Sequence, residues 1–369
     1  MIRGSTGVRT RLAIAALFVL LLSPAMAQER TVNFYNWSNY VAPGVLEDFT
    51  RETGIKVVYD TFDANETLET RLLAGKSGYD VVVPTAYFLQ RQIAANIFQK
   101  LDKSKLPNLA NAWPVVTKQL AIYDPGNQFA ANYMWGTTGI GYNVKMVQKI
   151  LGADAKIDSW DMVFKPENLA KFKDCGISMI DSPTEVFPPA LKYAGIDVNS
   201  QAIPDLQKAA DVHFKIRPYI RRYDSSEYIN ALANGDICLA WGYSSDVQIA
   251  KHRAMEAGKG VHIAFTIPKE GAQRYIDTMA IPKDAPHPES ALKFLNYIMD
   301  PKVIAKTSDK IYVQSGNSDA RQYVAPDIAN DPTIFPPASV EETIYSIIPS
   351  APDVDRARTR FWTRVKTGH

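Results

Sequence analysis

The order of strand-like and helix-like segments near the start of the chain constrains the fold more than any other feature. Three runs rich in β-branched and aromatic residues occupy residues 31–37, 55–62 and 79–87. Between them lie two amphipathic segments, residues 42–54 and 65–75, and each ends in glycine, a common stop signal of helices. This β-α-β-α-β order predicts a parallel sheet with helices on both faces, and therefore an α/β protein.

Aromatic and polar side chains follow two of these predicted strands. Residues 37–40, with the sequence WSNY, follow the first strand, and Thr85 and Tyr87 follow the third. In open α/β sheets, ligands bind beyond the carboxyl ends of the strands. We therefore expect both loops to open onto one cleft, although a large aromatic such as Trp37 can equally cap a core from one end.

The rest of the chain predicts a second lobe. Residues 129–143 form a long extended run with three glycines, which suggests a crossing between lobes. A second α/β set follows over residues 175–243, and strands and an amphipathic helix then return. We assign residues 28–135 and about 248–300 to the first lobe and residues 136–247 and about 301–369 to the second. Two such lobes imply hinge closure around a ligand.

The first 27 residues have the pattern of a secretory signal peptide. Three arginines precede a short apolar run at residues 12–22, and an Ala-x-Ala pattern ends at Ala27. The run is too short for a membrane-spanning helix, so we expect a soluble protein exported to the periplasm. After cleavage the chain has 38 basic and 39 acidic residues. This balance gives no reason to expect binding to nucleic acid or to an anionic membrane.

Only two cysteines are present, Cys175 and Cys238. In an oxidising compartment an even pair favours one disulfide, and the alternative is two buried free thiols. A bridge that closes the loop from residue 175 to residue 238 would stabilise the fold by roughly 4 kcal/mol in the chain-entropy model. A metal site built on the two cysteines lacks histidine or cysteine partners nearby.

Catalytic motifs are missing from the sequence. The five histidines form no zinc-binding spacing, and neither a Gly-x-Ser-x-Gly elbow nor a Walker sequence occurs. We therefore expect a protein that is not an enzyme and that holds no metal or cofactor.

Several longer stretches resemble one family. They include residues 35–45 (YNWSNYVAPGV), 79–92 (YDVVVPTAYFLQRQ), 133–143 (YMWGTTGIGYN), 225–247 (SSEYINALANGDICLAWGYSSDV) and 355–366 (DRARTRFWTRVK). The chain resembles the periplasmic polyamine-binding proteins of ABC importers, most closely the putrescine-binding branch. The resemblance implies a two-lobed periplasmic binding protein fold of type II with the ligand cleft between the lobes. It also implies that Cys175 pairs with Cys238 and that a monomer delivers a small polyamine or diamine to an inner-membrane ABC permease.

The resemblance also implies a set of ligand contacts. They are Trp37, Ser38, Asn39, Tyr40, Thr85, Tyr87, Glu185, Tyr243, Asp246, Tyr275 and Asp277. Three positions depart from the pattern of the putrescine binders. Asn39 stands where they usually have aspartate, Tyr87 replaces a small residue, and Val313 stands at a usual tyrosine. These departures leave open a related cation such as spermidine or agmatine, and a periplasmic amine-processing enzyme is the alternative from another class.

The residue types themselves suit a cation with an apolar stem. Carboxylates such as Glu185, Asp246 and Asp277 accept charge-assisted hydrogen bonds from ammonium groups, each contributing roughly 1.5–3 kcal/mol. Aromatic rings bury methylene groups and offer their faces to cations. The competing interpretation of each acid is a surface carboxylate, and for Asp246 a helix N-cap.

Overall fold

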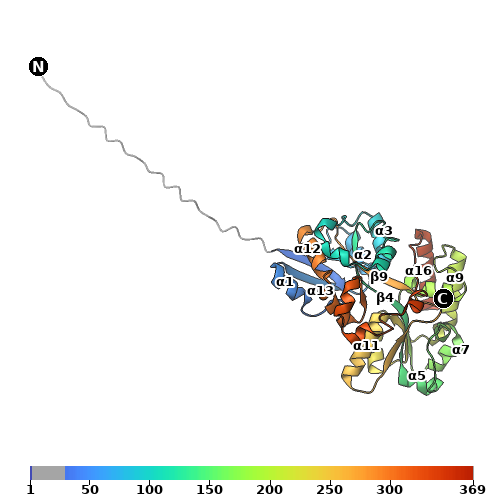
Figure 1. The fold of residues 1–369 in the computed structure, drawn as a ribbon. Coiled ribbons are helices and arrows are strands. Elements are labelled where there is room, and N and C mark those ends of the chain that lie inside the picture. Colours follow the sequence, from blue (N-terminus) through green and yellow to red (C-terminus); the bar gives the residue numbers. More distant parts are fainter. Residues whose placement is uncertain (2–29, 369) are drawn as a thin grey trace.

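The computed structural model describes Met1 and residues 30–368, so the predicted signal peptide lies outside the described residues except for Met1. The described chain forms two lobes whose strands follow one another in the order β2-β1-β3-β9-β4-β7-β5-β6, and β8 and β10 also pair with β4 (Figure 1). The strands are β1 (Thr31–Trp37), β2 (Lys56–Phe62), β3 (Val81–Val82), β4 (Ala130–Asn143), β5 (Ile177–Met179), β6 (Arg222–Tyr223), β7 (Leu239–Tyr243), β8 (Ile263–Thr266), β9 (Arg274–Ala280) and β10 (Gln314–Ser315).

Helices cover both faces of this sheet. The α-helices are α1 (Val45–Thr53), α2 (Asn65–Leu73), α3 (Ala86–Ala94), α4 (Pro114–Leu120), α5 (Val144–Leu151), α6 (Asp161–Phe164), α7 (Pro166–Leu169), α8 (Pro183–Tyr193), α9 (Ile203–Ile216), α10 (Tyr228–Asn234), α11 (Ser244–Ala257), α12 (Pro288–Ile298), α13 (Pro301–Ile311), α14 (Pro326–Ala329), α15 (Ala338–Glu341) and α16 (Pro352–Thr367). Short 3₁₀ turns are η1 (Lys103–Lys105), η2 (Pro107–Asn111), η3 (Ala170–Phe172), η4 (Arg217–Tyr219) and η5 (Ser318–Tyr323). None of the helices described here has the length and apolar character to cross a membrane.

The first five elements confirm the predicted β-α-β-α-β order. Strand β1 pairs in parallel with β2 and with β3, and α1 and α2 are the two crossover helices. Strand β3 is shorter than predicted. Pro84 has no amide hydrogen to donate to a neighbouring strand, and its carbonyl accepts from the backbone N–H of Thr278 at 3.0 Å. The loops after β1 and β3 therefore lie at the same edge of the sheet, as expected for parallel strands.

Strand β4 crosses between the lobes, as its length predicted. Residues 130–137 pair with β9, and residues 138–143 pair with β7 and β8. At the crossing, Gly136 leaves space for side chains of β9 and of α11. A Cβ at this position would lie 2.7 Å from Ser244 Oγ and would also clash with the hydroxyl of Tyr275.

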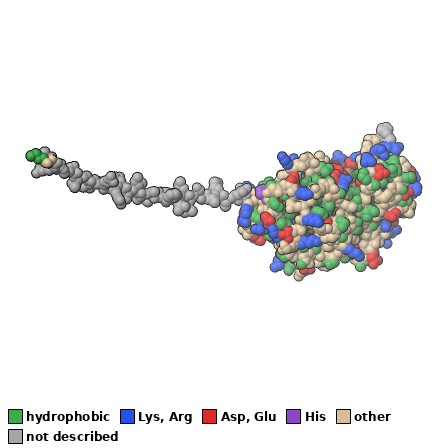
Figure 2. All heavy atoms as spheres, turned by 90° about the horizontal axis from the view of Figure 1, so that it is seen from above, with side chains coloured by type: hydrophobic (Ala, Val, Ile, Leu, Met, Phe, Trp, Pro, Cys, Tyr) green, Lys and Arg blue, Asp and Glu red, His purple; other side chains and the backbone are tan. Residues whose placement is uncertain are grey.

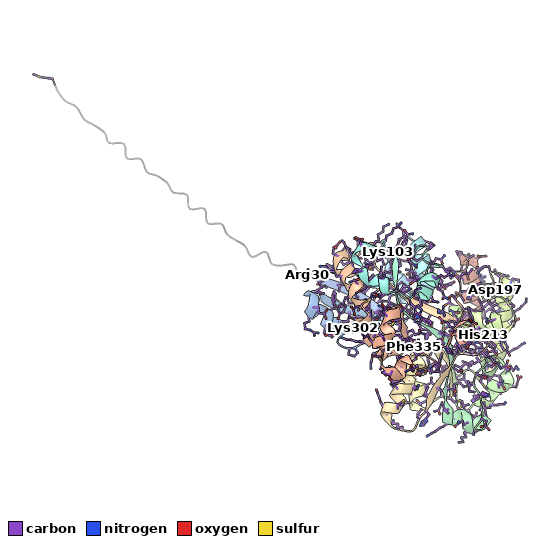
Figure 3. The ribbon with its side chains drawn as sticks, in the orientation of Figure 1. Arg30, Lys103, Asp197, His213, Lys302 and Phe335 are labelled. Carbon is purple, nitrogen blue, oxygen red and sulfur yellow. A yellow bond between two sulfur atoms is a disulfide. The ribbon has the colours of Figure 1, made fainter. Side chains whose placement is uncertain are left out.

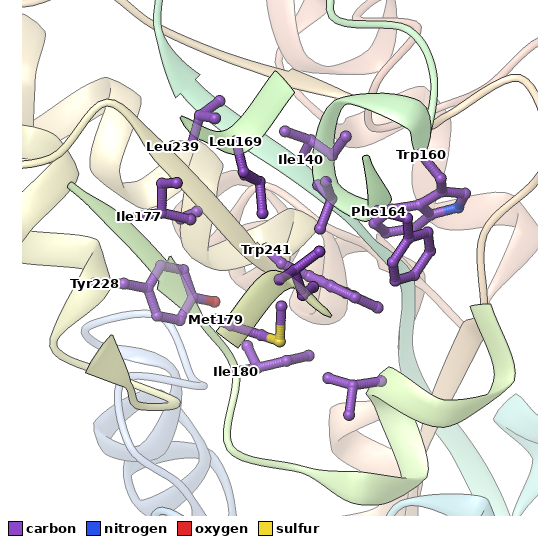
Figure 4. Packing of buried hydrophobic residues seen from close by; sticks show 14 of the residues in the cluster. Ile140, Trp160, Phe164, Leu169, Ile177, Met179, Ile180, Tyr228, Leu239 and Trp241 are labelled. Carbon is purple, nitrogen blue, oxygen red and sulfur yellow. The ribbon is translucent and has the colours of Figure 1, made fainter. Parts of the chain in front are cut away.

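The two lobes have separate hydrophobic cores. In the second lobe, Trp241 packs against Trp160 with ring centroids 4.5 Å apart, within a cluster that includes Met179 and Tyr228 (Figure 4). The first lobe has one core on each face of its sheet, and Phe34 and Tyr35 of β1 point to opposite ones. In Figure 3, His213 lies within the second lobe, whereas Phe335 of a first-lobe core lies near the junction.

These cores divide the chain differently from the predicted lobes. Helix α13, predicted in the second lobe, packs with residues up to Phe335 in a first-lobe core, because Ile304 and Ile311 form its apolar face. Residues 250–265, predicted in the first lobe, pack in the second-lobe core, because β8 pairs with the last residues of β4. The C-terminal helix α16 packs in the second-lobe core.

The predicted disulfide is confirmed. Cys175 and Cys238 are bonded with their Cα atoms 5.6 Å apart, an ordinary separation for a disulfide. The bridge lies wholly within the second lobe, beside the parallel pair β5 and β7. It can therefore stabilise that lobe without restricting movement between the lobes.

On the face drawn in Figure 2, basic and acidic side chains are interspersed.

Candidate functional site

A cavity of about 230 Å³ lies between the lobes. Its walls come from the loop after β1, from strand β9, and from the first turns of α2, α3, α8 and α11. All eleven residues predicted to face a ligand line this single cavity: Trp37, Ser38, Asn39, Tyr40, Thr85, Tyr87, Glu185, Tyr243, Asp246, Tyr275 and Asp277. That they contact a ligand stays a prediction.

Asp277 lies on β9 and is buried among hydroxyl groups. Its Oδ2 accepts a hydrogen bond from Tyr40 Oη at 2.8 Å, and its Oδ1 accepts from Thr85 Oγ1 at 2.7 Å. Asn65 fixes Thr85 in turn, because its amide donates to Thr85 Oγ1 and accepts from the Thr85 backbone N–H, both at 3.1 Å. Burial raises the pKa of Asp277 to about 6, although these hydroxyl donors favour the charged form.

Asp246 occupies the first turn of α11, directly after β7. Its Oδ2 accepts from Tyr228 Oη at 2.7 Å, and the same hydroxyl accepts from the backbone N–H of Tyr243 at 3.0 Å. It does not act as the N-cap side chain that the sequence allowed, since the cap residue of α11 is Tyr243. Burial raises the pKa of Asp246 to about 6.

Glu185 occupies the first turn of α8 and is also buried. Its Oε2 accepts from Gln273 Nε2 at 2.8 Å. Burial, with a smaller contribution from the negative charge of Asp277, raises the pKa of Glu185 to about 8. The positive end of a helix favours an ionised side chain in its first turn by roughly 0.3–1 kcal/mol, which is too little to offset this burial.

These three carboxyl groups share one electrostatic property. Each accepts hydrogen bonds from neutral donors, and within residues 30–368 none of them has a salt-bridge partner. A buried carboxylate without a countercharge is costly, and the protein responds by raising the pKa values. A cation that entered this cavity could supply the charge that these carboxyl groups lack among the described residues.

Aromatic side chains form the apolar walls. The rings of Tyr243 and Tyr275 meet edge to face with centroids 5.5 Å apart, and Tyr275 Oη donates to Ser245 Oγ at 3.2 Å. Trp37 packs against Phe62 at 4.6 Å. Tyr243 lies close enough to Glu185, Asp246 and Asp277 for their charges to raise the pKa of its hydroxyl, after the larger effect of burial. The rings therefore line the space that separates the carboxyl groups.

Three positions singled out in the sequence differ from a simple ligand contact. Two of them have structural roles in their loop, and the third lies outside the cavity. The backbone N–H and hydroxyl of Ser38 both donate to the carbonyl of Phe62. Asn39 is exposed and has φ of 59°, a left-handed conformation in which asparagine is favoured over most residues. Its identity therefore serves the turn as well as the cavity rim. Val313 does not line this cavity but a small pocket of about 10 Å³ behind Gly136.

Tyr87 uses its hydroxyl to join the two lobes. Its Oη donates to Asp355 Oδ1 at 2.8 Å and accepts from Arg358 Nη1 at 3.3 Å, and both partners belong to α16 of the second lobe. Arg358 also forms a salt bridge with Asp355 at 3.1 Å. The hydroxyl of Tyr87 is therefore engaged by another part of the chain, although the residue lines the cavity.

Other residues of the cavity were missed by the sequence reasoning. Among them are Asp63, Asn65, Glu66, Tyr123, Asp181, Gln273 and Arg274. Asp63, Glu66 and Asp181 are exposed acids at the rim. The alternation of side chains along β9 could have identified Gln273, because residues 273, 275 and 277 share one face of an extended chain. No comparable signal marks Tyr123.

Comparison with known proteins places these features in context. The family described as bacterial extracellular solute-binding protein matches residues 44–336. The chain is 48% identical to the putrescine-binding periplasmic protein PotF of Escherichia coli over 97% of both chains. It is 50% identical to the putrescine-binding periplasmic protein SpuD of Pseudomonas aeruginosa over 93% of both. A solved structure of a putative spermidine/putrescine ABC transporter from Listeria monocytogenes superposes with a TM-score of 0.81 at 27% identity, covering 92% of this chain and all of that one.

The raised pKa values predict how stability depends on pH. A carboxyl group with a folded-state pKa above its unfolded value contributes stability at low pH and loses it as the pH rises through the folded pKa. For Glu185 that loss extends up to about pH 8, and for Asp246 and Asp277 up to about pH 6. Between pH 6 and pH 8, the free energy of unfolding of the empty protein should fall relative to Glu185→Gln by on the order of 1 kcal/mol per pH unit. Denaturant unfolding across this range measures it, and parallel curves for the two proteins would contradict the raised pKa.

The contact between Tyr87 and α16 predicts a change in lobe closure. Tyr87→Phe removes the hydroxyl but keeps the ring, and Asp355→Ala removes the partner. Each should shift the closed-to-open ratio roughly tenfold toward open, since a hydrogen bond to a charged group contributes about 1.5 kcal/mol or more. The radius of gyration from small-angle scattering should increase in both variants, and the double variant should open no further than either single one.

Asp353→Asn is the matched control, because Asp353 is an exposed acid on the same turn of α16. It should leave the radius of gyration unchanged. A radius that stays constant in Tyr87→Phe as well would exclude a role of the hydroxyl in closure.

Proposed function

Because the chain belongs to the bacterial extracellular solute-binding protein family, we propose that it captures a small diamine or polyamine, putrescine foremost, and delivers it to an ABC permease of the inner membrane. Proteins of this family work in the periplasm or outside the cell, and this chain is a transport protein of that kind rather than an enzyme. The two close relatives carry names that specify putrescine, which supports the choice of ligand class.

One observation carries the proposal. Two buried carboxyl groups, Glu185 and Asp277, and the half-buried Asp246 surround an aromatic-walled cavity, and in the described chain no cation forms a salt bridge with them. A diamine supplies a positive charge at each end and an apolar stem between them. Its ammonium groups would pair with the carboxylates, and its methylenes would pack against Trp37 and Tyr243. The chemistry of the ligand therefore complements both parts of the wall.

The carboxyl groups come from both lobes, and this supports capture of the ligand by closure of the two lobes. Asp277 belongs to β9, which pairs with first-lobe strands, whereas Glu185 and Asp246 belong to helices packed on the second-lobe core. A cation held between them would join the lobes electrostatically. The permease would then bind a closed form that depends on the ligand. It could therefore distinguish the ligand-bound receptor from the empty one.

The test is binding of a panel of amines to the mature protein, unfolded and refolded first to remove any ligand carried through purification. Ligand at about 100 times its dissociation constant should add roughly 2.7 kcal/mol to the free energy of unfolding. We expect this response with putrescine or a close analogue. For Asp277→Asn we expect affinity to fall by at least about 2 kcal/mol, or roughly thirtyfold, because one charged partner is lost.

The folding of the variant gives the internal control. Since Asp277 is buried with a raised pKa, Asp277→Asn should leave the stability of the empty protein unchanged or increase it. Asp353→Asn, an exposed acid outside the cavity, should bind like the original protein. If no amine shifts the melting temperature of the refolded protein, the proposed function is wrong.

A further inference from the structure

Helix α16 contacts the rim of the cavity with one face and presents a row of arginines with another. On the inner face, Tyr87 Oη donates to Asp355 Oδ1 at 2.8 Å. On the next turns, Trp362 Nε1 donates to Asp181 Oδ1 at 2.6 Å. Tyr87 and Asp181 both line the cavity, and they follow strands of different lobes, β3 and β5. The helix is therefore bonded to both lobes at the rim.

The outward face of α16 carries three arginines spaced four residues apart. Arg356, Arg360 and Arg364 are exposed and lie on successive turns, so the row is about 12 Å long. The chain has no acidic residue from position 356 to position 368. Within residues 30–368, Arg356 and Arg360 form no ion pair, not even with the exposed Asp353 one turn earlier. The described chain therefore leaves these two charges uncompensated.

The other basic residues of this helix are used inside the fold. Arg358 is buried and forms a salt bridge with Asp355 at 3.1 Å. Lys366 forms one with Asp181 at 2.7 Å. The chain thus pairs the basic side chains of the inner face with acids, and it leaves the first two arginines of the outward row without one.

The helix dipole does not account for these two arginines. Basic residues are stabilising in the last turn of a helix, where the dipole is negative, and the effect falls off beyond that turn. Arg364 lies in the last turn of α16, but Arg356 and Arg360 lie at least one full turn before it. The protein is not basic as a whole, since the chain after Ala27 has 38 basic and 39 acidic residues. The row is therefore a local concentration of positive charge.

We infer that the outward face of α16, with Arg356 and Arg360, is the surface on which an acidic periplasmic segment of the ABC permease docks. The inference rests on the proposed function, because it assumes delivery to a permease. A guanidinium presents its N–H donors in a planar fork that matches a carboxylate, so acidic side chains complement this row.

The inner face of α16 favours a permease over a lipid surface as the partner. Through Tyr87 the helix is bonded to the first lobe, so its placement against that lobe depends on closure. A partner that recognises the ligand-bound form has to contact an element of this kind, whereas a lipid surface has no part in that recognition. The balanced charge of the whole chain also gives little attraction to an anionic membrane.

The experiment measures uptake of labelled putrescine into right-side-out, ATP-loaded inner-membrane vesicles of the bacterium that encodes the protein. The uptake rate is recorded against the concentration of added mature protein. In the double variant Arg356→Gln, Arg360→Gln, the half-saturating concentration should rise about tenfold at low salt, because two exposed charge pairs and electrostatic steering are lost. At about 0.5 M salt the difference should shrink to less than about threefold. Calorimetry should give an unchanged dissociation constant for putrescine, since neither arginine lines the cavity.

The double variant Lys145→Gln, Lys149→Gln is the matched control. These exposed lysines lie four residues apart on α5, at the opposite end of the second lobe from α16, and form no ion pair within residues 30–368 (Figure 1). Their removal changes the net charge by the same amount and should alter the half-saturating concentration by less than about twofold. All the substituted positions are exposed, so the melting temperatures should stay unchanged.

The outcomes separate the docking surface from the proposed function. An unchanged half-saturating concentration in the arginine variant, or an equal rise in the lysine variant, would overturn the docking surface while the protein remains an amine receptor. So would binding of the original protein to protein-free vesicles of anionic phospholipid that the arginine substitutions abolish, because the row would then bind lipid headgroups. If calorimetry detects no binding of putrescine to the original protein, the proposed function itself fails. Binding without uptake that depends on the added protein would contradict delivery, on which the inference rests.

Discussion

Two buried carboxyl groups, Glu185 and Asp277, and the half-buried Asp246 have no counter-cation among residues 30–368, and the rest of this structure depends on that constraint. Removing a carboxylate from water costs several kcal/mol, and hydroxyl and amide donors return only part of it. The raised pKa values, about 6 for Asp246 and Asp277 and about 8 for Glu185, reflect the part of this cost that the hydrogen bonds do not offset. A cation bound among them lowers this cost, so the ligand completes an electrostatic arrangement that the described chain leaves incomplete.

The same carboxyl groups link binding to movement. Asp277 belongs to the first lobe and Glu185 to the second, and the charge of Asp277 raises the pKa of Glu185. Closing an empty cavity therefore brings two like charges together or requires proton uptake, whereas a bound cation removes both costs. The hydrogen bond from Tyr87 to Asp355 acts in the opposite sense, because it favours closure with or without a ligand. The balance between the two sets the population of the closed form.

Much of this arrangement could be predicted from the sequence, and the exceptions have physical causes. The β-α-β-α-β order placed the loops after β1 and β3 at one edge, where both line the cavity. The partner of Tyr87 lies 268 residues away in the chain, so no local pattern could reveal it. The lobe boundaries depend on which strand each half of β4 pairs with, and a strand pattern does not contain that information. Gln273 was overlooked because a single glutamine before a strand has no chemical signature of its own.

Proton release on ligand binding tests the central claim most directly. In the empty cavity the Glu185 carboxyl, with a pKa of about 8, holds its proton at neutral pH, and a cation bound beside it should drive that proton off. Calorimetric titration with putrescine at neutral pH, in two buffers of different ionisation enthalpy, measures the number of protons released. The account predicts release of a substantial fraction of one proton, abolished by Glu185→Gln. A binding enthalpy that is independent of the buffer would contradict it.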